Sequence, residues 1–191
     1  MAVTLLASTD DVEAALGRDL TSDEGARVIA ILEKASELFR KHSGQRFTLG
    51  SSEVRLRVSG GKVYLPQRPV VEVESVVDDE DGRPVTYKRF KQWLTVSCPG
   101  RGFVVVKYSH GSQQVPDLVR LTVAEVAKKV LSISPKAAAG QTQHQEMVGP
   151  YSSLETYAVW AQGGQTILAP DDRAIAESFK FKLPKSIVMQ S

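Results

Sequence analysis

Apolar side chains recur every three or four residues in several stretches of the chain, and this spacing predicts amphipathic helices at about 9–16, 21–43 and 116–132. The second helix has the clearest signals, because Thr21 and Glu24 have the spacing of an N-terminal capping box. Its apolar stripe comprises Val28, Ile31, Leu32, Ala35, Leu38, Phe39 and His42.

Residues that typically begin or end helices stand at the borders of these segments. Thr9 or Asp10 is the expected N-cap of the first helix, and Gly44 is the expected stop of the second. Pro116 lies near the first helical position of the third. Two acids after Pro170 favour the start of a fourth, short helix.

The hydrophobic period changes to two between about 53 and 109, where five or six short strands are separated by turn residues. Gly60-Gly61 is typical of a hairpin turn, and the acidic run at 78–83 ends in Asp-Gly. These segments predict a small antiparallel sheet or a sandwich-like layer. The fold class is therefore α+β: an N-terminal helix pair and a following helix packed with a small antiparallel β region, then an extended arm and a short terminal helix.

The arm, residues 134–169, has neither a helical nor a strand period, although it lies between two predicted helices. Its large apolar residues would each cost roughly 1.5–3 kcal/mol if left in water. They are Met147, Tyr151, Leu154, Tyr157, Trp160, Ile167 and Leu168. We therefore expect an arm that is mobile in the isolated protein and orders against another subunit or partner. The predicted division is a helical and β domain at 1–133, the arm at 134–169, and a helix with a basic tail at 170–191.

Composition and charge are ordinary for a globular protein, with a formal net charge of +2, which by itself does not imply nucleic-acid binding. The single cysteine, Cys98, excludes an internal disulfide. The N-terminus lacks a basic start, and no apolar run is long enough to span a membrane. We expect a protein made in the cytoplasm.

No catalytic or metal-binding motif emerges from the residues. The three histidines, His42, His110 and His144, lack metal-ligand spacing. Ser59-Gly-Gly-Lys62 lacks the length and the following helix of a phosphate loop. The acidic run at 78–81 is typical of a solvated hairpin tip, because calcium-loop spacing is missing. We predict no cofactor and no enzymatic activity.

Basic residues cluster in two places, between two predicted strands and after Glu177. In a ring, a modest patch repeats around the axis and becomes a charged band that could line a channel for a polyanion. The candidates for this role are Lys88, Arg89, Lys91, Arg101, Lys180, Lys182 and Lys185.

The order and spacing of these segments resemble the head–tail adaptor (head-completion or connector) proteins of long-tailed bacteriophages over about residues 5–183. The likeness is carried by LEKASELFRKHSGQRF, VYLPQRPVVEVESV and VPDLVRLTVAEVAKKVLS, and most specifically by VGPYSSLETYA and TILAPDDRAIAESFKFK. The last two resemble the actinobacteriophage branch of the family.

The resemblance implies a virion protein, commonly in twelve copies, that forms a ring beneath the portal and extends the DNA channel. Its partners would be the portal, neighbouring copies, the next neck or tail-completion protein, and packaged double-stranded DNA. Because the C-terminal part engages the portal in this family, the expected portal- or neighbour-binding residues are Tyr151, Leu154, Tyr157, Trp160, Ile167, Leu168, Ile175, Phe179 and Phe181. Deleting 150–191 should then leave a folded protein that does not bind portal.

Other function classes remain open at this point. The closest rival is another neck component, such as a tail-completion or tail-terminator protein. A nucleic-acid-binding module is less favoured, because none of the predicted helices has a strongly basic exposed face. An enzyme is the least favoured class.

Overall fold

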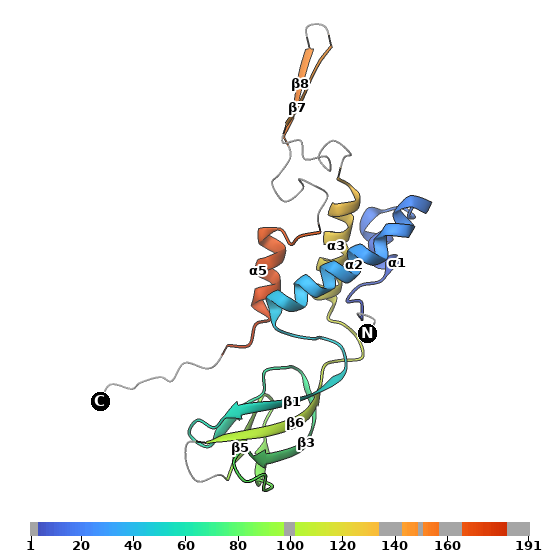
Figure 1. The fold of residues 1–191 in the computed structure, drawn as a ribbon. Coiled ribbons are helices and arrows are strands. Elements are labelled where there is room, and N and C mark those ends of the chain that lie inside the picture. Colours follow the sequence, from blue (N-terminus) through green and yellow to red (C-terminus); the bar gives the residue numbers. More distant parts are fainter. Residues whose placement is uncertain (1–3, 98–101, 134–142, 149–150, 157–165, 183–191) are drawn as a thin grey trace, which may run out of the picture. The chain divides into compact units, whose positions relative to one another are not determined.

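The computed structural model describes residues 4–97, 102–133, 143–148, 151–156 and 166–182 (Figure 1). The chain forms two compact units. The helical unit contains Met1–His42 and Val115–Ser178, and the β unit contains Ser43–Gln114 and Phe179–Ser191. The sequence-based division had placed the helices and the β region in one domain. In the chain, the β region is an insertion between two helices.

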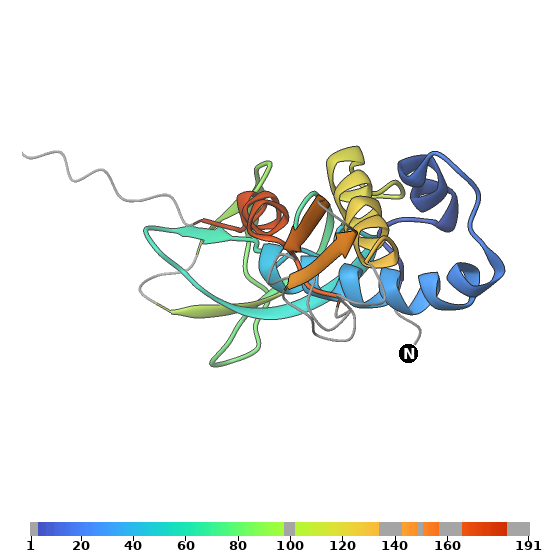
Figure 2. The ribbon, with the colours of Figure 1, turned by 90° about the horizontal axis from the view of Figure 1, so that it is seen from above.

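Four helices are described in the helical unit. They are α1 (Thr9–Leu16), α2 (Ser22–Ser43), α3 (Asp117–Leu131) and α5 (Pro170–Ser178). These bounds agree with the predicted helices to within a residue or two where both ends were predicted. Figures 1 and 2 show α2 passing across α3.

The ends of α1 and α2 are held by reciprocal side-chain caps. The N-cap of α1 is Ser8, which exchanges hydrogen bonds with Asp11, so the prediction of Thr9 or Asp10 as the cap was wrong. At the start of α2, the Thr21 amide donates to the Glu24 carboxylate and the Glu24 amide donates to the Thr21 hydroxyl, which confirms the predicted capping box. Gly17 ends α1 in the left-handed conformation, which residues with a side chain rarely adopt.

The core of the helical unit lies between the predicted apolar stripes. On α2, Val28, Ile31, Leu32, Ala35 and Phe39 are buried, and on α3, Val119, Val123, Val126, Ala127 and Val130 are buried. Ala176 of α5 joins them. The periodic signal therefore identified the buried faces of α2 and α3.

Polar side chains of α3 join it to two other helices. Arg120 forms ion pairs with Asp11 of α1 and with Asp117. The Lys129 amine lies 2.8 Å from a carboxylate oxygen of Asp172, an α5 residue that is itself buried. Arg120 and Lys129 therefore link α3 to α1 and to α5.

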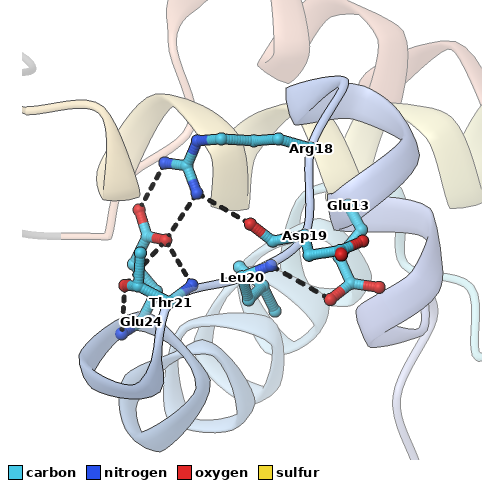
Figure 3. Close-up of polar contacts among 6 residues, drawn as sticks. All are labelled: Glu13, Arg18, Asp19, Leu20, Thr21 and Glu24. Atoms are coloured by element: carbon cyan, nitrogen blue, oxygen red, sulfur yellow. Dashed lines mark hydrogen bonds and ion pairs between the residues drawn. The ribbon is translucent and has the colours of Figure 1, made fainter.

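The loop between α1 and α2 is closed by a dense polar cluster (Figure 3). The Arg18 guanidinium donates to both carboxylate oxygens of Glu24, at 2.8 and 2.7 Å, and also to the Asp19 carbonyl. The Leu20 amide donates to Glu13. The Arg18 hydrogen bond and the Thr21 amide together lower the pKa of Glu24 to about 2.

The β unit contains two antiparallel sheets of three strands each, in the orders β1-β6-β3 and β2-β5-β4. The strands are β1 (Gly50–Arg57), β2 (Lys62–Tyr64), β3 (Val70–Asp78), β4 (Tyr87–Arg89), β5 (Trp93–Val96) and β6 (Phe103–His110). Both sheets contribute to one apolar core. It comprises Val58, Val63, Leu65, Val70, Val73, Val76, Leu94, Val96, Val104, Val106 and Tyr108.

The turn at Gly60-Gly61 forms as predicted, with positive φ at both glycines and two backbone hydrogen bonds between Ser59 and Lys62. The strands that it joins nevertheless belong to different sheets, because β1 pairs with β6 and β2 pairs with β5. The turn thus passes the chain from one sheet to the other.

Two strands form within the segment that the sequence indicated to be without regular structure. They are β7 (Gln143–Val148) and β8 (Tyr151–Thr156), which pair antiparallel from Gln143 opposite Thr156 to Val148 opposite Tyr151. The expectation of an arm with no internal secondary structure is therefore wrong for these strands. The backbone groups of these two strands therefore pair with one another within the arm.

Candidate interaction surfaces

The outer face of the β2-β5-β4 sheet combines cationic and aromatic side chains. Val63, Leu94 and Val96 point into the core, so the alternating residues of β2 and β5 point outward. Lys62 and Lys88 both lie opposite Thr95 in the strand registers, one on each side of β5. These three residues therefore form one cross-strand row on the outer face. We call this row, together with Phe90 and Trp93, the basic face.

The lysines of the basic face are positioned by aromatic rings. Phe90 and Trp93 stack face to face, with ring centroids 3.9 Å apart and planes 8° from parallel. The Lys62 amine lies 4.9 Å from the Trp93 centroid, and the Lys88 amine lies 5.8 Å from the Phe90 centroid. Such cation–π contacts hold an ammonium near its ring without neutralising it.

The C-terminal segment adjoins this face. Phe181 lies beside Tyr64, the second outward residue of β2, with ring centroids 6.4 Å apart. The Arg68 guanidinium lies over the Phe181 ring at 5.2 Å from its centroid. Lys180 and Lys182 flank Phe181 and are exposed. The two basic regions that the sequence indicated separately are thus brought to one sheet.

Arg89 does not belong to the basic face, although it was grouped with Lys88 and Lys91. The period of two turns it to the other side of β4, where its guanidinium donates to the carbonyls of Val70 and Val71. Arg89 therefore links β4 to β3. Arg101 and Lys185 lie outside the described residues.

The two units carry opposite formal charges, which the small net charge of the whole chain conceals. Over the unit boundaries, the β unit has 14 Lys and Arg against 7 Asp and Glu, a formal charge of +7. The helical unit has 10 against 15, a formal charge of −5. No acid occurs from residue 54 to 71 or from 82 to 116, and these two stretches contain the whole β2-β5-β4 sheet. The net charge of +2 that was considered in the sequence analysis is the sum of these two opposite charges.

The residues expected to bind portal or a neighbouring copy lie in different settings. Ile167 is 38% exposed, and Leu168 and Ile175 are half-buried. Phe179 packs edge-on against Phe47 of the β unit, with centroids 5.3 Å apart, and Phe181 packs as described above. Tyr151 and Leu154 lie on β8, and Tyr157 and Trp160 lie outside the described residues.

Three further apolar side chains are exposed on helices of the helical unit. Leu118 and Leu121 lie one turn apart on α3 and are 53% and 52% exposed, and Ile29 on α2 is 44% exposed. Sequence reasoning missed them because it followed only the main stripe of each helix. Because they lie outside that stripe, the sequence could have identified them as exposed apolar residues.

One polar pair, a buried histidine and a half-buried serine, has the residue types of a base and a nucleophile. Ser52 Oγ lies 2.8 Å from His110 Nε2, and burial lowers the pKa of His110, with the Arg46 charge adding to the effect. His110 Nδ1 has no hydrogen-bond partner among the described residues, so no third group there orients the ring. The described residues contain no cluster of three or more potential metal ligands. None of their helices is long and apolar enough to cross a bilayer.

The comparisons with known proteins bear on the fold. No protein-family model matches the sequence, and no curated protein matches it. Among solved structures, the chain is similar to one chain of "Neck of empty GTA particle computed with C6 symmetry", where GTA denotes a phage-like gene transfer agent. The TM-score is 0.50 at 13% identity, and the match covers 96% of this chain and 97% of that chain. The chain therefore has the fold of a protein found in the neck of a phage-like particle.

Proposed function

We propose that this chain is a structural protein of a virion neck, forming a ring beneath the portal that connects the DNA-filled head to the tail and extends the DNA channel. The observation that carries the proposal is the match to a neck chain over nearly the full length of both chains. Both units are included in that match, so the likeness is not confined to a common small β domain. The head–tail adaptor pattern in the sequence supports the same role independently.

The proposed ring has twelve copies. The matched neck was computed with sixfold symmetry, with which six or twelve copies are compatible. Its partners are the portal, neighbouring copies and the next neck protein. The purified chain mixed with its portal should give a complex whose native mass and image symmetry correspond to a twelve-fold ring. Separate elution of the two proteins at micromolar concentration would contradict the proposal.

Exposed apolar groups of the helical unit make the contacts with neighbouring copies and portal in this proposal. Ile167 is the expected portal contact, and Leu118 and Leu121 are the expected contacts with a neighbouring copy. Deleting 150–191 is a poor test, because it removes α5, whose Ala176 and Asp172 are buried in the helical unit. This truncation is therefore expected to destabilise the helical unit.

Point substitutions replace that truncation. Ile167→Asp should abolish portal binding, and L118Q/L121Q should abolish ring formation, with the melting temperature of the monomer unchanged in both. Arg27→Gln, an exposed α2 residue, provides a control that should do neither.

A second candidate is a tail-completion or tail-terminator protein of the same neck. The matched structure is named for the neck as a whole, so the similarity is compatible with either neck component. It predicts binding to the tail tube and not to the portal. Pull-downs against each partner separate the two functions.

A further inference from the structure

We propose that the basic face binds the phosphate backbone of double-stranded DNA without reading its sequence, through Lys62 and Lys88 on either side of Thr95. The proposal deepens the proposed function, on which it rests for the source of the DNA. Its main test uses the isolated chain and needs no portal.

The first support is the geometry of the row. Neighbouring strands lie about 4.8 Å apart, so the backbones at Lys62 and Lys88 are separated by roughly 10 Å with Thr95 between them. Two ammonium groups and a hydroxyl are all groups that donate hydrogen bonds to phosphate oxygens. A strand framework fixes their spacing, which reduces the ordering cost of binding.

The second support is the absence of internal competition for these charges. Among the ion pairs between described residues, none includes Lys62, Lys88 or Lys91. The other sheet differs, because Arg55 pairs with Asp79 and Lys107 pairs with Glu74 on its outer side. A polyanion approaching the basic face therefore meets cations without first displacing a carboxylate.

The aromatic rings favour a duplex over a single strand. Single-stranded nucleic acid binds by stacking its bases on open ring faces. Phe90 and Trp93 instead cover one another, and a lysine amine lies over each ring. The rings therefore position the lysine amines and are not open to stacking bases. Contact with the phosphate backbone of the nucleic acid is the binding mode that this arrangement favours.

The experiment measures the affinity of the full chain for a 30-base-pair duplex by fluorescence anisotropy over a series of salt concentrations. Each phosphate contact contributes about 0.9 to the slope of log K against log salt. K62Q/K88Q should therefore lower the slope by about 1.8. The matched control R57Q/K34Q removes the same charge from exposed residues outside the basic face that make no described ion pair, and it should leave the slope within about 0.5 of the parent value.

Three results would overturn the proposal. Equal losses of slope in both double variants would mean that only the overall charge matters. Tighter binding of a single strand of the same length, lost in Phe90→Ala, would mean base stacking. Equal competition by polyglutamate at matched charge would mean an acidic protein partner.

A second measurement separates this proposal from the proposed function. K62Q/K88Q should still form the complex with portal, with unchanged mass and symmetry. If the ring forms normally but parent and variant bind the duplex equally, the proposal that the basic face binds DNA is contradicted and the proposed neck function is not. If K62Q/K88Q lowers the salt slope as expected but the parent forms no ring with portal, the proposed neck function is contradicted and DNA binding by the basic face is not.

Discussion

The helical unit and the β2-β5-β4 sheet of the β unit use their charges in different ways. The helical unit is net acidic, and several of its charged residues join elements of the fold, as Arg120 and Lys129 do for α3. The β unit is net basic, and its core is built from apolar residues of two facing sheets. Cations of the basic face make no described ion pair and remain available to a polyanion. The net charge of the whole chain therefore describes the surface of neither unit.

The largest effect is expected where the β unit depends on a close backbone approach. Gly111 has a φ of +93°, and a Cβ there would lie 2.1 Å from the Thr48 carbonyl oxygen. Gly111→Ala should therefore destabilise the β unit by about 3 kcal/mol. Faster hydrogen exchange at β6 amides, with α3 amides little changed, would place the loss in the β unit.

Gly82→Ala is the matched control for that variant. Gly82 also has a positive φ, at +68°, but nothing lies within 4 Å of its added Cβ. The left-handed conformation alone should cost about 1 kcal/mol. Equal losses in the two variants would contradict the steric explanation.

The next largest effect is expected in the helical unit, at the ion pair between α3 and α5. Lys129→Met leaves the Asp172 carboxylate, only 8% exposed, without its partner. We expect a loss of about 2 kcal/mol in chemical unfolding, below the value for a fully buried pair because the lysine is one third exposed. K129M/D172N should be more stable than K129M, since no unpaired charge remains. Additive losses in this double-mutant cycle would exclude a coupled pair.

Much of the helical unit could be predicted from the sequence, because a 3.6-residue period states both that a helix exists and which face is buried. Sheet pairing could not be predicted in the same way. A hydrophobic period of two indicates which side chains of a strand share a face, but it does not indicate which other strand pairs with it. The pairing of β1 with β6 was therefore not predicted. The strands β7 and β8 were missed because they are short and polar, and only Gly149-Pro150 between them is typical of a turn.

The basic face was predicted only in part, for the same reason. Lys88 and Lys91 stand out as a cluster in the sequence, but Lys62 and Thr95 join Lys88 only through strand register. Arg89 could have been separated from Lys88 by strand alternation alone. The opposite formal charges of the two units could be calculated only once the bounds of the units were known. The pairing of β1 with β6 sets those bounds.

A smaller effect is expected at the start of α2. Thr21→Ala removes the acceptor for the Glu24 amide and should cost about 1 kcal/mol. Thr21→Ser keeps the hydroxyl and should cost less than half as much. Hydrogen exchange at the first-turn amides of α2 would report the loss locally, and an unchanged rate in Thr21→Ala would contradict the role of the cap.

The smallest effect is a pH dependence at the same cap. Glu24 has a pKa of about 2 in the folded chain, against a reference value of 4.5, because the Arg18 side chain and the Thr21 amide bind its ionised form. A lowered carboxyl pKa contributes stability above the unfolded pKa, and this contribution is lost as pH falls through the folded pKa. Glu24→Gln should therefore melt below the parent protein at pH 7, and the gap should close between about pH 4.5 and pH 2. Glu33→Gln, at an exposed position on the same helix, is the matched control for removing one carboxylate. A gap for Glu24→Gln that stayed constant with pH would assign its loss to packing rather than to the ionised carboxylate.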